Sequence, residues 1–196
     1  MNPLRAWKMT VTAGVAGMLL VCSARSVRAQ AAAVPADIQA ELIAKLETYD
    51  RTFPSRAGPV AHVLIVVRPG SSKSELSAAD TKAALGRVDK LGGLPHQESV
   101  VPFAGAAALA DRCRSEQAAV VYVTPGFEDD LDAIRAALST VSVLTVGSTA
   151  DYVAHGIVLG FELESGKPKI VINLEQAKLQ SVSFPADLLR LMKVLR

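Results

Sequence analysis

Short apolar runs rich in β-branched residues alternate with helical segments through most of the chain. Residues 60–67 read Val-Ala-His-Val-Leu-Ile-Val-Val, and residues 118–123 and 141–146 are also mainly apolar. A run that is apolar at almost every position is typical of a strand covered on both faces of a sheet. Strands that alternate with helices in this way form βαβ units. The sequence therefore predicts an α/β fold, a three-layer α/β/α domain with a mostly parallel sheet.

The helices are expected from apolar spacing and from capping residues. Asp37 is expected to cap a first helix that runs to about Tyr49, and either Ser77 or Asp80 to open a second helix that ends near Lys90. The remaining expected elements are a strand at 97–102 and helices at 104–115, 128–138 and 149–154.

The C-terminal part departs from this alternation. Residues 156–163 and 169–173 are strand-like and are separated by the turn Glu-Ser-Gly-Lys-Pro, so they predict an antiparallel hairpin at one edge of the sheet. A short helix is expected at 174–179 and a final helix at 185–195. The apolar residues of the final helix that share one face are Leu188, Leu189, Met192 and Leu195.

The N-terminus has the anatomy of a secretory signal peptide. A charged start precedes a short apolar run and then small residues, which predicts cleavage between Ala29 and Gln30. Residues 1–29 would then be the signal peptide and residues 37–196 a single α/β domain. A membrane anchor is the competing interpretation, but the apolar run is shorter than the roughly 20 residues that span a bilayer. Lipid attachment at Cys22 is a further alternative, although Val21 is bulky where a small residue is expected.

Charge and cysteine content exclude several classes of function. The formal net charge is +2, with 21 basic and 19 acidic residues dispersed along the chain, which does not indicate nucleic acid binding. Removing residues 1–29 takes away four basic residues and no acidic one, so the exported chain would carry −2. Cleavage would also leave Cys113 as the sole thiol. A lone cysteine outside the cytosol is either buried and inert or available for an intermolecular bridge, and Arg112 and Arg114 beside it would favour its thiolate.

No motif in the sequence indicates a catalytic centre, a cofactor or a metal. Residues 68–74 follow a strand but have Ser72 where a phosphate-binding loop needs glycine. The three histidines, His62, His96 and His155, lack partners at metal-ligand spacing. The acidic residues at 128–132 are expected to stabilise a helix N-terminus. We therefore expect neither an enzyme nor a cofactor-binding protein.

From residue 143 onward the chain contains an ordered set of short segments. These segments are 143–147 (Val-Leu-Thr-Val-Gly), 151–154, 155–161 (His-Gly-Ile-Val-Leu-Gly-Phe), 170–174 (Ile-Val-Ile-Asn-Leu) and 188–191 (Leu-Leu-Arg-Leu). As an ordered set, and not through a single motif, they resemble the YfiR-like family of periplasmic regulatory proteins. A weaker match occurs at Tyr49 and at 52–54. The family usually has two glycines where this chain has His155 and Gly156, and an aromatic residue where it has Ile170.

The resemblance implies a regulator that acts by binding. Such proteins bind the periplasmic sensor part of an inner-membrane signalling protein, typically a diguanylate cyclase, and hold it inactive, while an outer-membrane lipoprotein draws the repressor away. A homodimer is left open. The redox control associated with the family's cysteine pairs is not implied here, because this chain lacks those pairs.

The family-motif residues are expected to have structural roles. Gly156 would allow a close approach of the backbone, Asn173 would cap or turn at a strand end, and Leu188, Leu189 and Leu191 would pack the final helix. The alternative function is a periplasmic small-molecule binding protein. Its site would be the crevice at the carboxyl ends of the strands, lined by the loops after Val67, Val123 and Val146.

Overall fold

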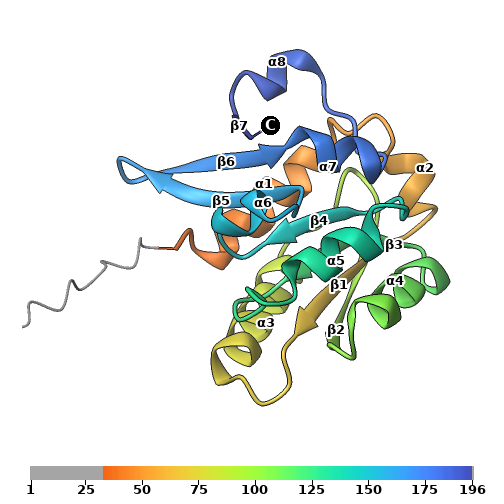
Figure 1. Cartoon of the computed structure of the whole chain (residues 1–196). Coiled ribbons are helices and arrows are strands. Elements are labelled where there is room, and N and C mark those ends of the chain that lie inside the picture. Colours follow the sequence, from red (N-terminus) through yellow and green to blue (C-terminus); the bar gives the residue numbers. More distant parts are fainter. Residues whose placement is uncertain (1–32, 196) are drawn as a thin grey trace, which may run out of the picture. The chain divides into compact units, whose positions relative to one another are not determined.

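The computed structural model describes residues 33–195, which form a seven-stranded sheet with helices on both faces (Figure 1). The strands lie in the order β2-β1-β3-β4-β5-β6-β7. Their bounds are β1 Ala61–Val67, β2 His96–Pro102, β3 Ala118–Val123, β4 Leu144–Gly147, β5 Leu159–Glu164, β6 Lys167–Asn173 and β7 Lys193–Leu195. The helices are α1 Ala36–Glu47, α2 Phe53–Ala57, α3 Ser72–Leu85, α4 Ala106–Ser115, α5 Leu131–Leu138, α6 Asp151–Ala154, α7 Leu174–Leu179 and α8 Ala186–Leu189.

The first five strands of the sheet are parallel, as the sequence predicts. β1 pairs with β2 on one side and β3 on the other, and β4 and β5 continue in the same direction. All six residues of β3 are buried, because helices cover both faces of the strand.

Two apolar cores lie on opposite faces of the sheet. Val63 and Ile65 of β1 belong to the core that includes residues of α1 and α3, whereas Leu64 and Val66 belong to the core that includes residues of α4 and α5. Successive side chains of a strand point to opposite faces, so one short apolar run contributes to both cores. The mostly parallel three-layer α/β/α fold is thereby confirmed.

Helix α3 begins earlier than the sequence predicts. Ser71 caps it by accepting a hydrogen bond from the Ser74 backbone N–H, so neither Ser77 nor Asp80 opens the helix. The first turns carry polar residues and Leu76, which is 64% exposed. This part of α3 therefore has only a weak apolar stripe. For that reason the spacing of apolar residues does not predict where the helix begins.

The predicted hairpin of β5 and β6 is present, and a further strand lies outside it. β5 and β6 pair antiparallel, and β7 then pairs with β6 in parallel and forms the edge of the sheet. The prediction of one helix over 185–195 is wrong, because the helix ends at Leu189 and residues 193–195 join the sheet. Backbone pairing with β6 gives Val194 and Leu195 hydrogen-bond partners that a helix end would leave open.

The leucines near the C-terminus differ in burial. Leu188 and Leu189 pack partly buried against the core beneath α1 and α3, and Met192 is buried in it. Leu191 is 70% exposed, so the expectation that it packs the final helix is wrong.

Gly156 allows the turn before β5 to approach α5 closely. Its φ is +92°, and a Cβ built on it would lie 1.9 Å from Arg135 Cδ and 2.4 Å from Arg135 Cγ. Gly93 offers a matched comparison, because its φ is +86° and a Cβ there would meet nothing within 4 Å.

Replacing Gly156 with alanine should therefore destabilise the protein more than Gly93→Ala does. Backbone strain alone costs about 1–3 kcal/mol, and only Gly156→Ala adds the collision with Arg135. Urea unfolding of both variants measures the difference, and Arg135→Ala added to Gly156→Ala should recover part of it. If Gly156→Ala and Gly93→Ala lower the free energy of unfolding equally, the close approach to Arg135 does not explain the need for glycine at position 156.

Candidate functional site

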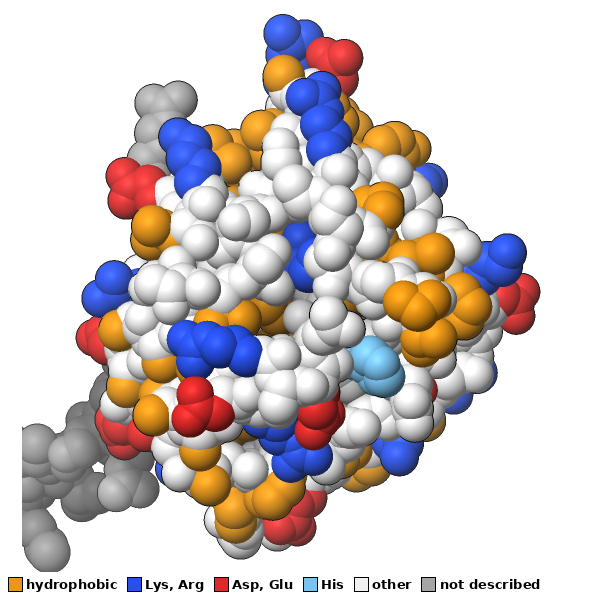
Figure 2. Space-filling model, turned by 90° about the vertical axis from the view of Figure 1, so that its right-hand side faces the viewer, with side chains coloured by type: hydrophobic (Ala, Val, Ile, Leu, Met, Phe, Trp, Pro, Cys, Tyr) orange, Lys and Arg blue, Asp and Glu red, His pale blue; other side chains and the backbone are white. Residues whose placement is uncertain are grey.

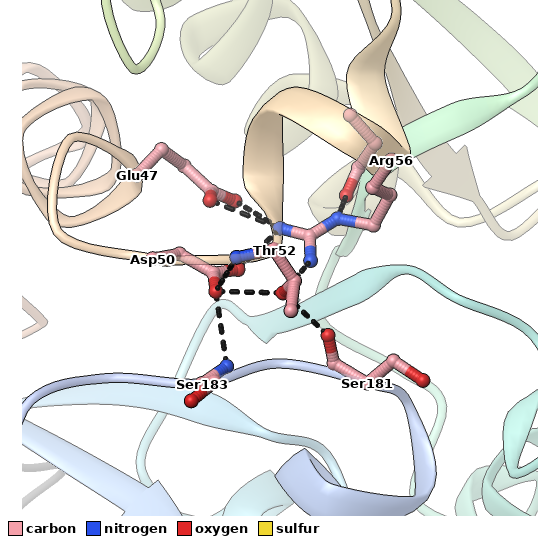
Figure 3. Close-up of polar contacts among 7 residues, drawn as sticks. Glu47, Asp50, Thr52, Arg56, Ser181 and Ser183 are labelled. Atoms are coloured by element: carbon pink, nitrogen blue, oxygen red, sulfur yellow. Dashed lines mark hydrogen bonds and ion pairs between the residues drawn. The ribbon is translucent and has the colours of Figure 1, made fainter.

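Three charged side chains form a buried cluster where α1, α2 and the C-terminal segment meet (Figure 3). Arg56 Nη2 of α2 donates to Glu47 Oε2 at 3.0 Å and to Asp50 Oδ2 at 2.8 Å. The side chains of all three residues are at most 1% exposed. A buried charge is tolerated only where it is paired and hydrogen-bonded, so these residues depend on one another.

The cluster connects four parts of the chain. Asp50 Oδ1 accepts hydrogen bonds from the backbone N–H groups of Thr52 and Ser183, each at 3.0 Å. Thr52 Oγ1 lies 2.6 Å from the Ser181 carbonyl oxygen, and Arg56 Nε donates to the Ala119 carbonyl oxygen of β3. The cluster thus holds α1, α2, β3 and the segment 181–183 together.

Two carboxyl groups share one guanidinium in this cluster, and burial and the neighbouring Asp50 both raise the pKa of Glu47. Burial raises the pKa of Glu47 from its ordinary value of 4.5 to about 8, against the opposing attraction of Arg56. Asp50 accepts hydrogen bonds from two backbone N–H groups as well as from Arg56. Glu47 accepts hydrogen bonds only from Arg56 among the described residues, and its burial favours the protonated form of this carboxyl at neutral pH.

This arrangement predicts that the free energy of unfolding falls as the pH rises. Folding takes up a proton on Glu47 between pH 4.5 and about 8. The stabilisation is complete below 4.5 and is lost on the way to 8, with a slope of at most about 1.4 kcal/mol per pH unit.

Glu47→Gln should remove this part of the pH dependence, because glutamine keeps the shape and stays neutral. Urea unfolding at several pH values between 5 and 8 measures the slope, and Glu41→Gln, on the exposed face of α1, is the control. If wild type and Glu47→Gln have the same slope, Glu47 is already ionised at neutral pH and the assignment is wrong.

A pocket of about 500 Å³ lies at the amino ends of the parallel strands. The end of α4 and the starts of β3 and β4 border it, together with α2 and Ser181. Its lining residues are Thr52, Ser55, Arg56, Cys113, Arg114, Gln117, Ala118, Thr140, Val141, Ser142 and Ser181. Figure 2 views the side of the molecule on which α2 and α4 lie, and recessed Lys or Arg atoms are visible near its centre among uncharged atoms.

At the carboxyl ends of the strands, where the alternative function would place a ligand, the protein's own side chains bind the loops to one another. The Arg68 guanidinium lies over the Phe127 ring at 4.7 Å and donates to the Gly126 carbonyl oxygen and to Asp130. The Tyr152 hydroxyl accepts from the backbone N–H groups of Gly126 and Phe127 at 2.9 and 3.0 Å. These contacts tie the loops after β1 and β3 to α6.

The acidic residues at 128–132 act differently from the expectation. α5 begins at Leu131, and its N-cap residue Asp130 makes no side-chain capping bond. Asp130 pairs instead with Arg68, and Glu128 accepts a hydrogen bond from the Tyr152 hydroxyl at 3.2 Å. These two carboxylates therefore help to close the carboxyl ends of the strands, while Asp132 lies in the first turn of α5.

Asn173 lies where β6 passes directly into α7. Its Oδ1 accepts from the Gln176 backbone N–H at 2.9 Å, and its Nδ2 donates to the Val153 carbonyl oxygen at 3.2 Å. Asn173 thus caps α7 and connects it to α6. The predicted cleavage site at Ala29 and Gln30 lies outside the described residues.

Cys113 is buried against the core formed with α4 and α5, and it is 2% exposed. Burial raises its pKa to about 12, and Glu116 adds to the increase. Arg114 and Arg112 favour the thiolate, as expected, but their attraction is weaker than these effects, so the thiol stays protonated. A protonated, buried thiol is unsuited to forming an intermolecular bridge.

We therefore predict that Cys113 resists alkylation in the folded protein. At pH 8, iodoacetamide should label it slowly in buffer and rapidly in denaturing urea, because only the thiolate reacts. Mass spectrometry of the intact protein measures the labelled fraction over time. Rapid labelling of the folded protein, or a disulfide-linked dimer on a non-reducing gel, would contradict this prediction.

Residues 33–195 contain no cluster of three or more metal-ligating side chains. His96 instead contacts Glu98 and, through Nε2 at 2.8 Å, the Val88 carbonyl oxygen. No helix in this part of the chain has the length and apolar character needed to cross a membrane.

The buried Glu47–Asp50–Arg56 cluster was missed by sequence reasoning, although a signal for it exists. Glu47 follows Ile43 by four positions and adjoins Leu46, so it extends the buried stripe of α1. A carboxylate on an apolar stripe predicts a buried partner. The sequence does not show that the partner is Arg56, because Arg56 lies on another helix.

Comparison with solved structures of other proteins identifies the class of fold to which this chain belongs. An ABC domain in complex with L-Trp from Streptococcus pneumonia is 14% identical with a TM-score of 0.58, covering 82% of this chain and 62% of that one. A conserved domain protein from Vibrio cholerae is also 14% identical with a TM-score of 0.58, covering 83% and 60%. A ligand-free, open substrate-binding protein with adhesive properties from Clostridium difficile is 10% identical with a TM-score of 0.53, covering 74% and 57%. The chain thus spans about three fifths of these structures, and the likeness concerns the fold.

A match to a family model assigns the chain more narrowly than its likeness in fold to these structures. The YfiR/HmsC-like family model matches residues 36–193, so the chain belongs to this family of periplasmic regulatory proteins. No curated protein matches the chain.

Proposed function

We propose that this protein is exported, loses residues 1–29 by cleavage after Ala29, and represses an inner-membrane signalling protein. Its target is the periplasmic sensor domain of that protein, and a diguanylate cyclase is the proposed class. An outer-membrane lipoprotein that competes for the repressor would relieve the repression. The observation that carries the proposal is the family match over residues 36–193.

The proposed mechanism is a shift in the population of two sensor states. A binding protein changes such an equilibrium only by its difference in affinity for the two states. A difference of about 100-fold, or 2.7 kcal/mol, is enough to turn an evenly populated sensor mostly into the inactive state. This mechanism requires no chemical step. It is consistent with a domain in which the buried charged groups described here are paired with one another.

We assign the contact surface to the C-terminal segment from α7 to β7. Leu179 at the end of α7 is 55% exposed, and Leu191, between α8 and β7, is 70% exposed. Figure 2 shows hydrophobic side chains among charged ones at the top of the molecule, where Figure 1 places α8. Burying a leucine fully contributes about 1.5–3 kcal/mol, so these two side chains would supply much of the affinity.

Leu179→Glu and Leu191→Glu should each weaken binding of the membrane partner by at least tenfold. Both leucines are exposed, so the free energy of unfolding should change little. The measurement is crosslinking in intact cells, followed by identification of the captured protein and N-terminal sequencing of the exported repressor. Leu76→Glu is the matched control, because Leu76 on α3 is 64% exposed, between Leu179 and Leu191, and this variant should bind normally.

Capture of an inner-membrane sensor by the wild type and its loss in both variants would support the proposal. Capture of a soluble enzyme complex instead would overturn the regulatory function. Equal capture by Leu76→Glu, Leu179→Glu and Leu191→Glu would place the contact on another surface.

A further inference from the structure

The pocket at the amino ends of the strands has an unusual charge composition. Two arginines, Arg56 and Arg114, line it, and no aspartate or glutamate does. Five hydroxyl groups and the Gln117 amide add further polar groups, while Cys113, Ala118 and Val141 supply an apolar part. The carboxylates that pair with these arginines lie outside the lining: Glu47 and Asp50 pair with Arg56, and Asp111 pairs with Arg114. The remaining guanidinium N–H groups and the hydroxyls are donors that suit a ligand with negative oxygen atoms.

The two arginines are positioned differently. Arg56 is fixed, because Glu47, Asp50 and Ala119 already hold its Nη2 and Nε atoms. Its Nη1 has a single partner among residues 33–195, Thr52 Oγ1 at 3.3 Å, so one Nη1 hydrogen remains for a ligand. Arg114 is 49% exposed at the side chain and contacts Asp111 and Thr140, and it can therefore move towards a ligand.

Two residues with left-handed backbone conformation also line this pocket. Gln117 has φ +50° and follows α4, and Ser181 has φ +56° and follows α7; only three non-glycine residues in the described chain have positive φ. The position after a helix end favours glycine in this conformation. Both positions keep a polar side chain despite the strain, and strained residues concentrate at functional sites.

We propose that this pocket binds a small organic oxyanion, a carboxylate or a phosphate ester, between Arg56 and Arg114. The oxyanion accepts hydrogen bonds from Arg56 Nη1, from the Arg114 guanidinium and from the Gln117 amide. The remaining body of the ligand lies against Ala118 and Val141. The site lies at the opposite end of the strands from the contacts of Arg68 and Tyr152, and this proposal does not rest on the proposed membrane partner.

The test uses the purified exported protein and three probes: inorganic phosphate, pyruvate and L-malate, with glycerol as the uncharged comparison. Isothermal titration at constant ionic strength measures binding. At least one of the oxyanions should bind saturably and glycerol should not. Arg114→Gln should weaken binding at least tenfold, whereas Arg112→Gln, on the same helix and paired with Glu116, should leave it unchanged.

Gln117→Gly separates a ligand-binding role from a structural one. Glycine relieves the left-handed strain, so this variant should be as stable as the wild type or more so, and yet bind the oxyanion at least fivefold more weakly. The proposal is overturned if none of the three oxyanions binds saturably. It is equally overturned if binding is unchanged in both Arg114→Gln and Gln117→Gly, because the ligand then lies elsewhere.

Discussion

The sharing of one guanidinium by two buried carboxyl groups determines how α1, α2 and the segment 181–183 are held to the sheet. Arg56 lies on a five-residue helix that cannot be stable by itself. Its bonds to Glu47 and Asp50, and the Asp50 bond to the Ser183 backbone, fix α2 between α1 and the C-terminal segment. A hydrophobic contact would hold these elements without direction, whereas charged hydrogen bonds also fix their orientation. Removing both acids would leave the Arg56 guanidinium as an unpaired buried charge in an apolar core.

This cluster lies at the amino ends of the parallel strands, and that position separates this chain from the usual arrangement of open α/β sheets. Ligands usually bind at the carboxyl ends, where the loops can vary without disturbing the sheet. Here Arg68 and Tyr152 fill that side and join the loops after β1 and β3. The open pocket lies on the opposite side, next to Arg56. The proposed oxyanion site therefore lies at the opposite end of the strands from the position that is usual for this class of sheet.

The elements that the sequence predicts correctly are those whose own residues indicate burial or periodicity clearly. Residues 118–123 were predicted as a strand and form β3 with the same bounds, because a strand buried on both faces must be apolar throughout. The start of α3 was missed, since its exposed turns have no apolar stripe to detect. β7 depends on pairing with β6, a long-range contact that three residues cannot encode locally. The charged cluster and the pocket likewise depend on residues far apart in the sequence, so only the fold brings them together.

The proposed pocket and the proposed contact surface meet in one short stretch of chain. Ser181 lines the pocket, and Leu179, two residues before it, belongs to the surface assigned to the membrane partner. The Ser181 carbonyl oxygen also contacts Thr52 of the charged cluster. An oxyanion that rearranges Arg56 or Thr52 would change the contacts that hold this stretch. If the ligand alters affinity for the partner, the partner must alter affinity for the ligand by the same factor, because the two binding free energies are linked. A regulator built in this way would report the concentration of a small molecule outside the cytosol through the fraction of sensor that it holds inactive.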